Sequence, residues 1–137
     1  MDSEVVVSAA ARAAALWSGL NLFLYLVLAV LVTRQRQRHH VLIGDGDLVE
    51  LARPMRAFGN ASEYVPAALL VLALLAMLGA HPLVVHGMGA LLLVARVLHG
   101  VGLSNNEGVS FGRTSGAVLT WLYYLLSSAL LIFYCLP

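Results

Sequence analysis

The sequence predicts an all-α integral membrane protein in which four helices form a single bundle. Of the 137 residues, 61% are hydrophobic and only 11% are charged. The mean hydropathy of +0.87 lies outside the range of soluble globular domains. A helix needs about 20 apolar residues to cross a bilayer, so four spans use nearly the whole chain. We therefore expect one transmembrane domain over residues 1–137 and no strands.

The first span is predicted over residues 8–32, where a long apolar run contains few polar side chains. The following connection, from Thr33 to about Arg53, carries several arginines and a Gly44-Asp-Gly-Asp47 turn signal. Because hydrocarbon cannot hydrogen-bond such a polar segment, we expect this connection to lie in water.

The other three spans are predicted over residues 60–79, 82–103 and 115–136, with a tight reversal at 79–82 between the second and the third. Arginines flank the first and third connections, whereas the second connection has none. The positive-inside rule therefore predicts that both termini lie outside and that the first and third connections are cytoplasmic.

The small net charge of +1 argues against a nucleic-acid partner. The single cysteine, Cys135, excludes an intramolecular disulfide and any metal site of the cysteine type. The histidines are also scattered, with His81 and His86 at one membrane edge and His39 and His40 in the polar connection, so no metal site is expected.

Ionisable side chains interrupt the second predicted span at its start. Arg56, Asn60 and Glu63 fall at positions i, i+4 and i+7, which places them on one stripe of a helix near the cytoplasmic side. A charged residue at the centre of a spanning helix costs about 2.5–3.5 kcal/mol on insertion scales. Such residues therefore need a partner, a water-filled cavity or a ligand.

The third span repeats this spacing with Arg96, His99 and Leu103, and its end returns to the same side of the membrane. Two interpretations of the two stripes stay open. They form a polar ligand pocket, or they form a structural network in which Glu63 pairs with Arg96 and Asn60 bonds across helices.

Four arginines are predicted near this membrane edge, and only Glu63 opposes them: Arg53, Arg56, Arg96 and Arg113. Guanidinium groups bind carboxylates with two parallel hydrogen bonds and keep their charge when partly dehydrated. This excess favours a small ligand with several carboxylates. For Arg53, ordinary anchoring at the membrane interface is the preferred explanation.

Two motifs and the four-span length resemble the membrane-associated proteins in eicosanoid and glutathione metabolism (MAPEG), in a bacterial-type member. The motifs are Arg56-x-x-x-Asn60-x-x-Glu63-x-x-Pro66 and Arg96-x-x-His99-Gly100. The resemblance implies a homotrimer in the bacterial inner membrane, with glutathione bound between subunits near the cytoplasmic face. It also implies conjugation or peroxide reduction of a lipophilic substrate that enters from the bilayer.

The resemblance assigns glutathione binding to five residues: Arg56, Asn60, Glu63, Arg96 and His99. It matches Arg113, at the start of the fourth helix, to the arginine proposed to activate the thiol. A free thiol has a pKa near 8.5 and is mostly protonated at neutral pH, whereas a nearby guanidinium favours the thiolate. Glutathione itself would supply the nucleophile, so Cys135 is expected to be a packed membrane thiol.

The chain departs from this family pattern at two positions. Leu103 stands where several relatives have an aromatic hydroxyl, and Gly59 stands where they have an arginine. Tyr64 and Tyr123 are alternative hydroxyls, although packing is the role expected of both.

Two other functions compete with the glutathione enzyme. One is a non-catalytic lipid-binding or scaffold protein of the same family. The other is a small proton-coupled exporter in which Glu63 works against Arg96 and the substrate is cationic. The basic cytoplasmic edge argues against the exporter.

Overall fold

The structure is a computed structural model that describes residues 7–105 and 108–136, so both ends of the predicted domain lie outside it. These ranges contain no strand and four helices: α1 (Ala9–His39), α2 (Val49–Met77), α3 (Pro82–Asn105) and α4 (Phe111–Cys135). Each helix is long and apolar enough to cross a membrane. The predicted all-α membrane bundle is confirmed.

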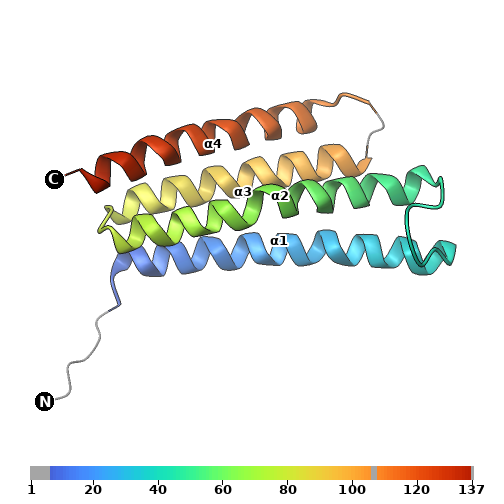
Figure 1. Cartoon of the computed structure of the whole chain (residues 1–137), viewed down its shortest axis with the longest axis horizontal. Coiled ribbons are helices and arrows are strands. Elements are labelled where there is room, and N and C mark those ends of the chain that lie inside the picture. Colours follow the sequence, from blue (N-terminus) through green and yellow to red (C-terminus); the bar gives the residue numbers. More distant parts are fainter. Residues whose placement is uncertain (1–6, 106–107, 137) are drawn as a thin grey trace, which may run out of the picture.

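The helices run up and down beside one another (Figure 1). The start of α1, the α2–α3 turn and the end of α4 lie at one end of the bundle. The α1–α2 and α3–α4 connections lie at the other, which we call the loop end. Helix α4 packs mainly on α3 and less closely on α2, and its backbone does not approach that of α1 among the described residues. Helices α1 and α4 therefore form opposite edges.

The helices extend beyond the predicted apolar spans at the loop end. Helix α1 continues through its arginines to His39, and His40 ends it in the left-handed conformation with φ of 56°. Helix α2 begins at Val49, well before residue 60. Arginine and glutamine are good helix formers, so polarity excludes them from hydrocarbon but not from a helix. The predicted polar connection is thus largely helical.

Two apolar clusters hold the bundle together. One contains buried side chains from all four helices and includes Leu72, Leu75, Val85, Leu92 and Tyr123. The second lies nearer the loop end and contains Leu28, Ala57, Ala61, Val65 and Leu103. Leu103 is therefore a packing residue, which agrees with its apolar character.

Small residues let α1 approach α3 closely. Trp17 lies against Gly89, where the Cβ of any larger residue would overlap the indole ring. The indole N–H of Trp17 donates a hydrogen bond of 3.0 Å to Nδ1 of His86. This contact fixes α1 and α3 at the end of the bundle opposite the loop end.

Glycines also bring the first turns of α4 against the backbone of α3. A Cβ at Gly116 would lie 2.5 Å from the backbone nitrogen of His99, and one at Gly102 would overlap the backbone nitrogen of Arg113. Real Cβ atoms do not approach backbone so closely, because packed interiors leave little free space. The absence of side chains here sets Arg113 beside His99.

Candidate functional site

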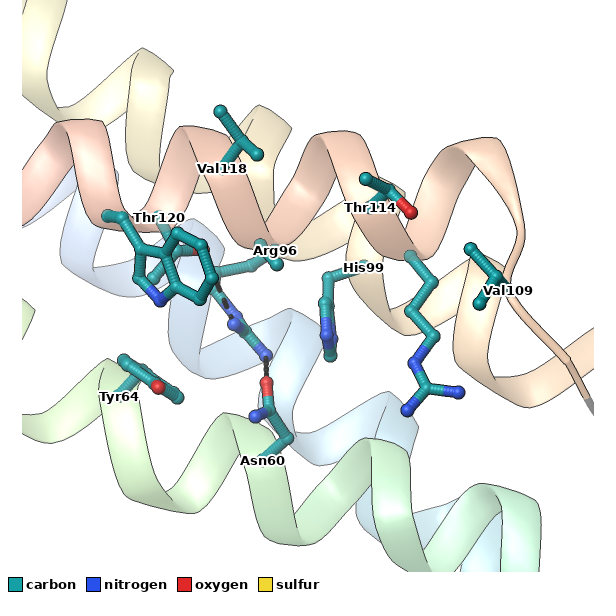
Figure 2. Close-up of a pocket in the computed structure, with 11 residues that line it drawn as sticks. Asn60, Tyr64, Arg96, His99, Val109, Thr114, Val118 and Thr120 are labelled. Carbon is teal, nitrogen blue, oxygen red and sulfur yellow. Dashed lines mark hydrogen bonds between the residues drawn. The ribbon is translucent and has the colours of Figure 1, made fainter.

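A pocket of about 360 Å³ opens between α2, α3 and α4 in the half of the bundle nearer the loop end (Figure 2). We call it the interhelix pocket. Its lining residues are Asn60, Tyr64, Arg96, His99, Val109, Arg113, Thr114, Ala117, Val118, Thr120 and Trp121.

Arg96 forms the centre of the pocket and is only 1% exposed. Its Nη2 donates a 2.9 Å hydrogen bond to Oδ1 of Asn60, and its Nη1 donates a long 3.5 Å bond to Oγ1 of Thr120. Its Cζ lies 5.8 Å from the ring centre of Tyr64, within cation–π range. All three partners are uncharged, so they orient the guanidinium without cancelling its charge.

His99 and Arg113 continue the polar wall toward the loop end. His99 is buried, and its Nδ1 has no hydrogen-bond partner among the described residues. Arg113 lies in the first turn of α4, whose N-cap Ser110 accepts the Arg113 N–H at 3.3 Å and donates to the Gly102 carbonyl at 3.2 Å. The cap thereby fixes the start of α4, and with it Arg113, to α3.

The interhelix pocket is positively charged, because two arginines line it and its lining includes no aspartate or glutamate. Part of its α4 side is apolar. Val118 and Trp121 line the pocket and are largely exposed at the outer surface of the bundle. The pocket therefore combines an anion-attracting wall, formed by Arg96 of α3 and Arg113 at the start of α4, with an apolar wall formed by Val118 and Trp121.

The sequence model of the MAPEG family matches residues 14–133. The chain belongs to the MAPEG family. It is also similar to the inner membrane protein YecN from Escherichia coli strains K12 and O6:H1. Each relative is 35% identical over 112 residues, which cover 82% of this chain and 84% of the relative. The MAPEG resemblance is confirmed, and the four apolar helices make this a multi-pass membrane protein in contact with lipid.

The structure brings together four of the six site residues predicted for this MAPEG chain. Asn60, Arg96, His99 and Arg113 all line the interhelix pocket, and Figure 2 shows the Arg96 guanidinium pointing at Asn60, with His99 beside it. They come from α2, α3 and α4, so only the folded MAPEG bundle assembles them.

The other two predicted residues, Arg56 and Glu63, are exposed on α2 and do not line the pocket. Successive residues turn by about 100° around a helix. Arg56 and Glu63 therefore lie about 40° and 60° to one side of Asn60, whereas Tyr64 lies about 40° to the other. The pocket lies on the side of α2 that carries Asn60 and Tyr64. The carboxylate of Glu63 is therefore left on the outer flank of α2.

Of the structural network considered from the sequence, the central pair is not a direct contact. Arg96 bonds to Asn60 and Thr120. Glu63 forms no ion pair within hydrogen-bonding distance among the described residues, although its negative charge interacts electrostatically with Arg96 from outside the pocket. The expected bond from Asn60 across helices is present.

Sequence reasoning also missed part of the pocket. Tyr64 was expected to be a packing residue, yet it lines the pocket; Tyr123 does pack in the core and donates to the Ala68 carbonyl at 2.7 Å. The contribution of α4 beyond Arg113 was not predicted. A signal for it exists, because Ala117, Thr120 and Trp121 follow Arg113 at helical spacing and share its face.

Proposed function

We propose that this MAPEG protein is a glutathione-dependent membrane transferase or peroxidase that acts on a lipophilic electrophile or hydroperoxide. The observation that carries the proposal is the two-sided interhelix pocket. One wall offers the guanidinium groups of Arg96 and Arg113, and the other offers exposed apolar side chains of α4. An anionic thiol and a lipophilic partner can meet between them.

The pocket suits glutathione in size and charge. Its volume of about 360 Å³ falls in the range of about 300–1,000 Å³ typical of small-molecule sites. The tripeptide carries two carboxylates, and the buried guanidinium of Arg96 offers paired donors to one of them. Arg96 Nε and His99 Nδ1 are buried without protein partners in the described chain, and buried polar atoms usually have one.

Arg113 is the proposed activating residue. A guanidinium beside the thiol stabilises its charged form, so the thiol loses its proton to water more readily. In a transfer reaction the thiolate sulfur forms a bond to a carbon of the electrophile, and the leaving group departs with the electron pair of the broken bond. The enzyme supplies position and charge, which reduce the barrier without a protein nucleophile.

Arg56 and Glu63 enter the proposal through a second subunit. Both lie on the exposed flank of α2 beside the pocket, where a neighbouring copy would convert the flank into a closed cleft. We propose that a homotrimer forms there and that Arg56 and Glu63 hold the end of glutathione that extends from the pocket. Because glutathione is a cytosolic thiol, the loop end would face the cytoplasm of a bacterial inner membrane.

An ultraviolet difference spectrum of glutathione added to the detergent-purified protein tests occupancy and activation together. We expect a thiolate band that Arg113→Ala removes while calorimetry still detects binding. Arg56→Ala and Glu63→Ala are expected to abolish binding, and Arg12→Ala, which removes an exposed arginine at the other end of α1, is expected to change nothing. Absence of saturable binding by the unaltered protein would refute the proposal.

A non-catalytic lipid-binding or scaffold role is the second candidate, favoured by Leu103. This side chain is buried in the core and supplies no hydroxyl one turn beyond His99. Conjugation of chlorodinitrobenzene by the purified protein would exclude this role. The exporter has less support, since Glu63 lies outside the pocket and Arg96 uses its hydrogen bonds on Asn60 and Thr120.

A further inference from the structure

A second polar site lies on α1, away from the interhelix pocket, which contains no α1 residue. At the loop end of this helix, five side chains line a surface groove of about 600 Å³: Leu31, Arg34, Gln35, Gln37 and Arg38. The two arginines are one helical turn apart, so their guanidinium groups project from the same face.

These two arginines are uncommitted within the protein. Neither forms a hydrogen bond or ion pair with any residue of the described ranges, and both are exposed. Arg36, between them in sequence, behaves differently, because it donates a 3.1 Å bond to the carbonyl of Leu42 and closes the α1–α2 loop. Arg36 is a structural residue, whereas Arg34 and Arg38 are available to a ligand.

An exposed apolar stripe leads along the same face of α1 to the arginine pair. Phe23, Val27 and Leu31 are exposed and precede Arg34 at intervals of three or four residues. At 1.5 Å per residue, Phe23 and Arg34 are about 16 Å apart along the helix. One leaflet of hydrocarbon is about 15 Å thick, which is half of a typical core. The length of the stripe therefore matches that of one acyl chain, and the arginine pair lies at the depth of the phosphate.

We propose that this face of α1 is a binding site for one anionic phospholipid. The phosphodiester lies between the guanidinium groups of Arg34 and Arg38, with the amides of Gln35 and Gln37 as further donors, and an acyl chain lies along Phe23, Val27 and Leu31. Arginine pairs suit phosphate because their planar groups offer paired donors. The site does not depend on the proposed glutathione chemistry.

Native mass spectrometry of the full-length protein, with phosphatidylglycerol or phosphatidylcholine of identical acyl chains, tests the site. We expect tighter retention of phosphatidylglycerol, with affinity falling about fivefold for each of Arg34→Gln and Arg38→Gln, the effect of about one basic residue near a lipid surface. Arg12→Gln is the matched control, because it removes one exposed arginine from the other end of the same helix.

Equal retention of the two lipids by the unaltered protein, or equal loss in Arg12→Gln and Arg38→Gln, would overturn the proposal. Displacement of phosphatidylglycerol by millimolar inorganic phosphate would also overturn it, in favour of a site for soluble phosphates. Because a variant can fail to fold, the unaltered protein is also measured at rising salt, which must reduce the preference for phosphatidylglycerol. A preference insensitive to salt contradicts an arginine–phosphate contact.

Discussion

Arg96 is a charged side chain enclosed by uncharged partners. Moving a guanidinium away from water is costly, and an ion pair would offset part of that cost. Here Asn60 and Thr120 supply hydrogen bonds and Tyr64 supplies a ring face. The charge of Arg96 is therefore positioned by the protein but still available to an anion.

Asn60→Ala should lower the free energy of unfolding by about 1–2 kcal/mol, since a buried charged donor loses its 2.9 Å acceptor. Unfolding in mixed detergent micelles measures the change. Thr33→Ala is the control, because the exposed Thr33 hydroxyl only bonds to the Ala29 carbonyl one turn earlier. Equal stability of the two variants would show that Asn60 does not hold Arg96.

At this scale the sequence predicted the chemistry of the pocket better than its orientation. Spacing placed Arg56, Asn60 and Glu63 on one stripe, and that spacing is a property of any helix. The spacing did not show which edge of the stripe faces α3 and α4, because the rotation of α2 about its own axis depends on how the neighbouring helices pack. Tyr64 was missed for the same reason.

At the scale of the helix, α4 owes its position to residues without side chains. Gly102, Gly112 and Gly116 all lie where a Cβ would overlap the facing helix. The apolar runs predicted the four helices, but not their ends at the loop side, because hydropathy marks the hydrocarbon and not the hydrogen-bonded helix. The close α3–α4 contact was also beyond prediction, since it requires knowing which helices are neighbours.

Gly116→Ala should destabilise the bundle by about 1–3 kcal/mol, because overpacking displaces backbone. The new Cβ would lie 2.5 Å from the His99 nitrogen and 2.7 Å from the Ala95 carbonyl oxygen. Moving α4 should also reduce the thiolate band of added glutathione, since Arg113 leaves its place beside His99. Thermal unfolding and ultraviolet difference spectroscopy measure the two effects.

Gly87→Ala is the matched control for this substitution. It makes the same change on α3 with no atom within 4 Å of the new Cβ, and alanine favours a helix by about 1 kcal/mol over glycine. This variant should be as stable as the unaltered protein or more so. A Gly116→Ala protein that matches it would contradict the close-contact explanation.

At the scale of the whole molecule, the bundle is open on one side. Helices α1 and α4 do not meet within the described chain, and α4 is held chiefly by α3. The interhelix pocket lies where α4 and α2 diverge, so the limited contact between these two helices is what provides its space. The even number of spans brings the start of α1 and the end of α4 to the same end (Figure 1).

The single native cysteine allows a direct test of membrane orientation. Cys135, which was expected to be packed, is instead exposed near the end of α4. The arginine distribution predicts that this end lies outside. A membrane-impermeant maleimide should therefore label intact cells. In a Cys135→Ser, Leu42→Cys protein, whose new thiol lies in the exposed α1–α2 loop, labelling should require broken cells. The opposite pattern would reverse the predicted topology.

The two tryptophans of the chain occupy very different surroundings. Trp17 is fixed between Gly89 and His86, whereas Trp121 is 62% exposed on the apolar wall of the interhelix pocket. Indole fluorescence shifts with the polarity around the ring, so a Trp17→Phe protein keeps a single indole, that of Trp121, on the wall of the interhelix pocket. A molecule that binds beside Trp121 would then shift the wavelength of its intrinsic emission, so occupancy can be followed without an added dye and without turnover.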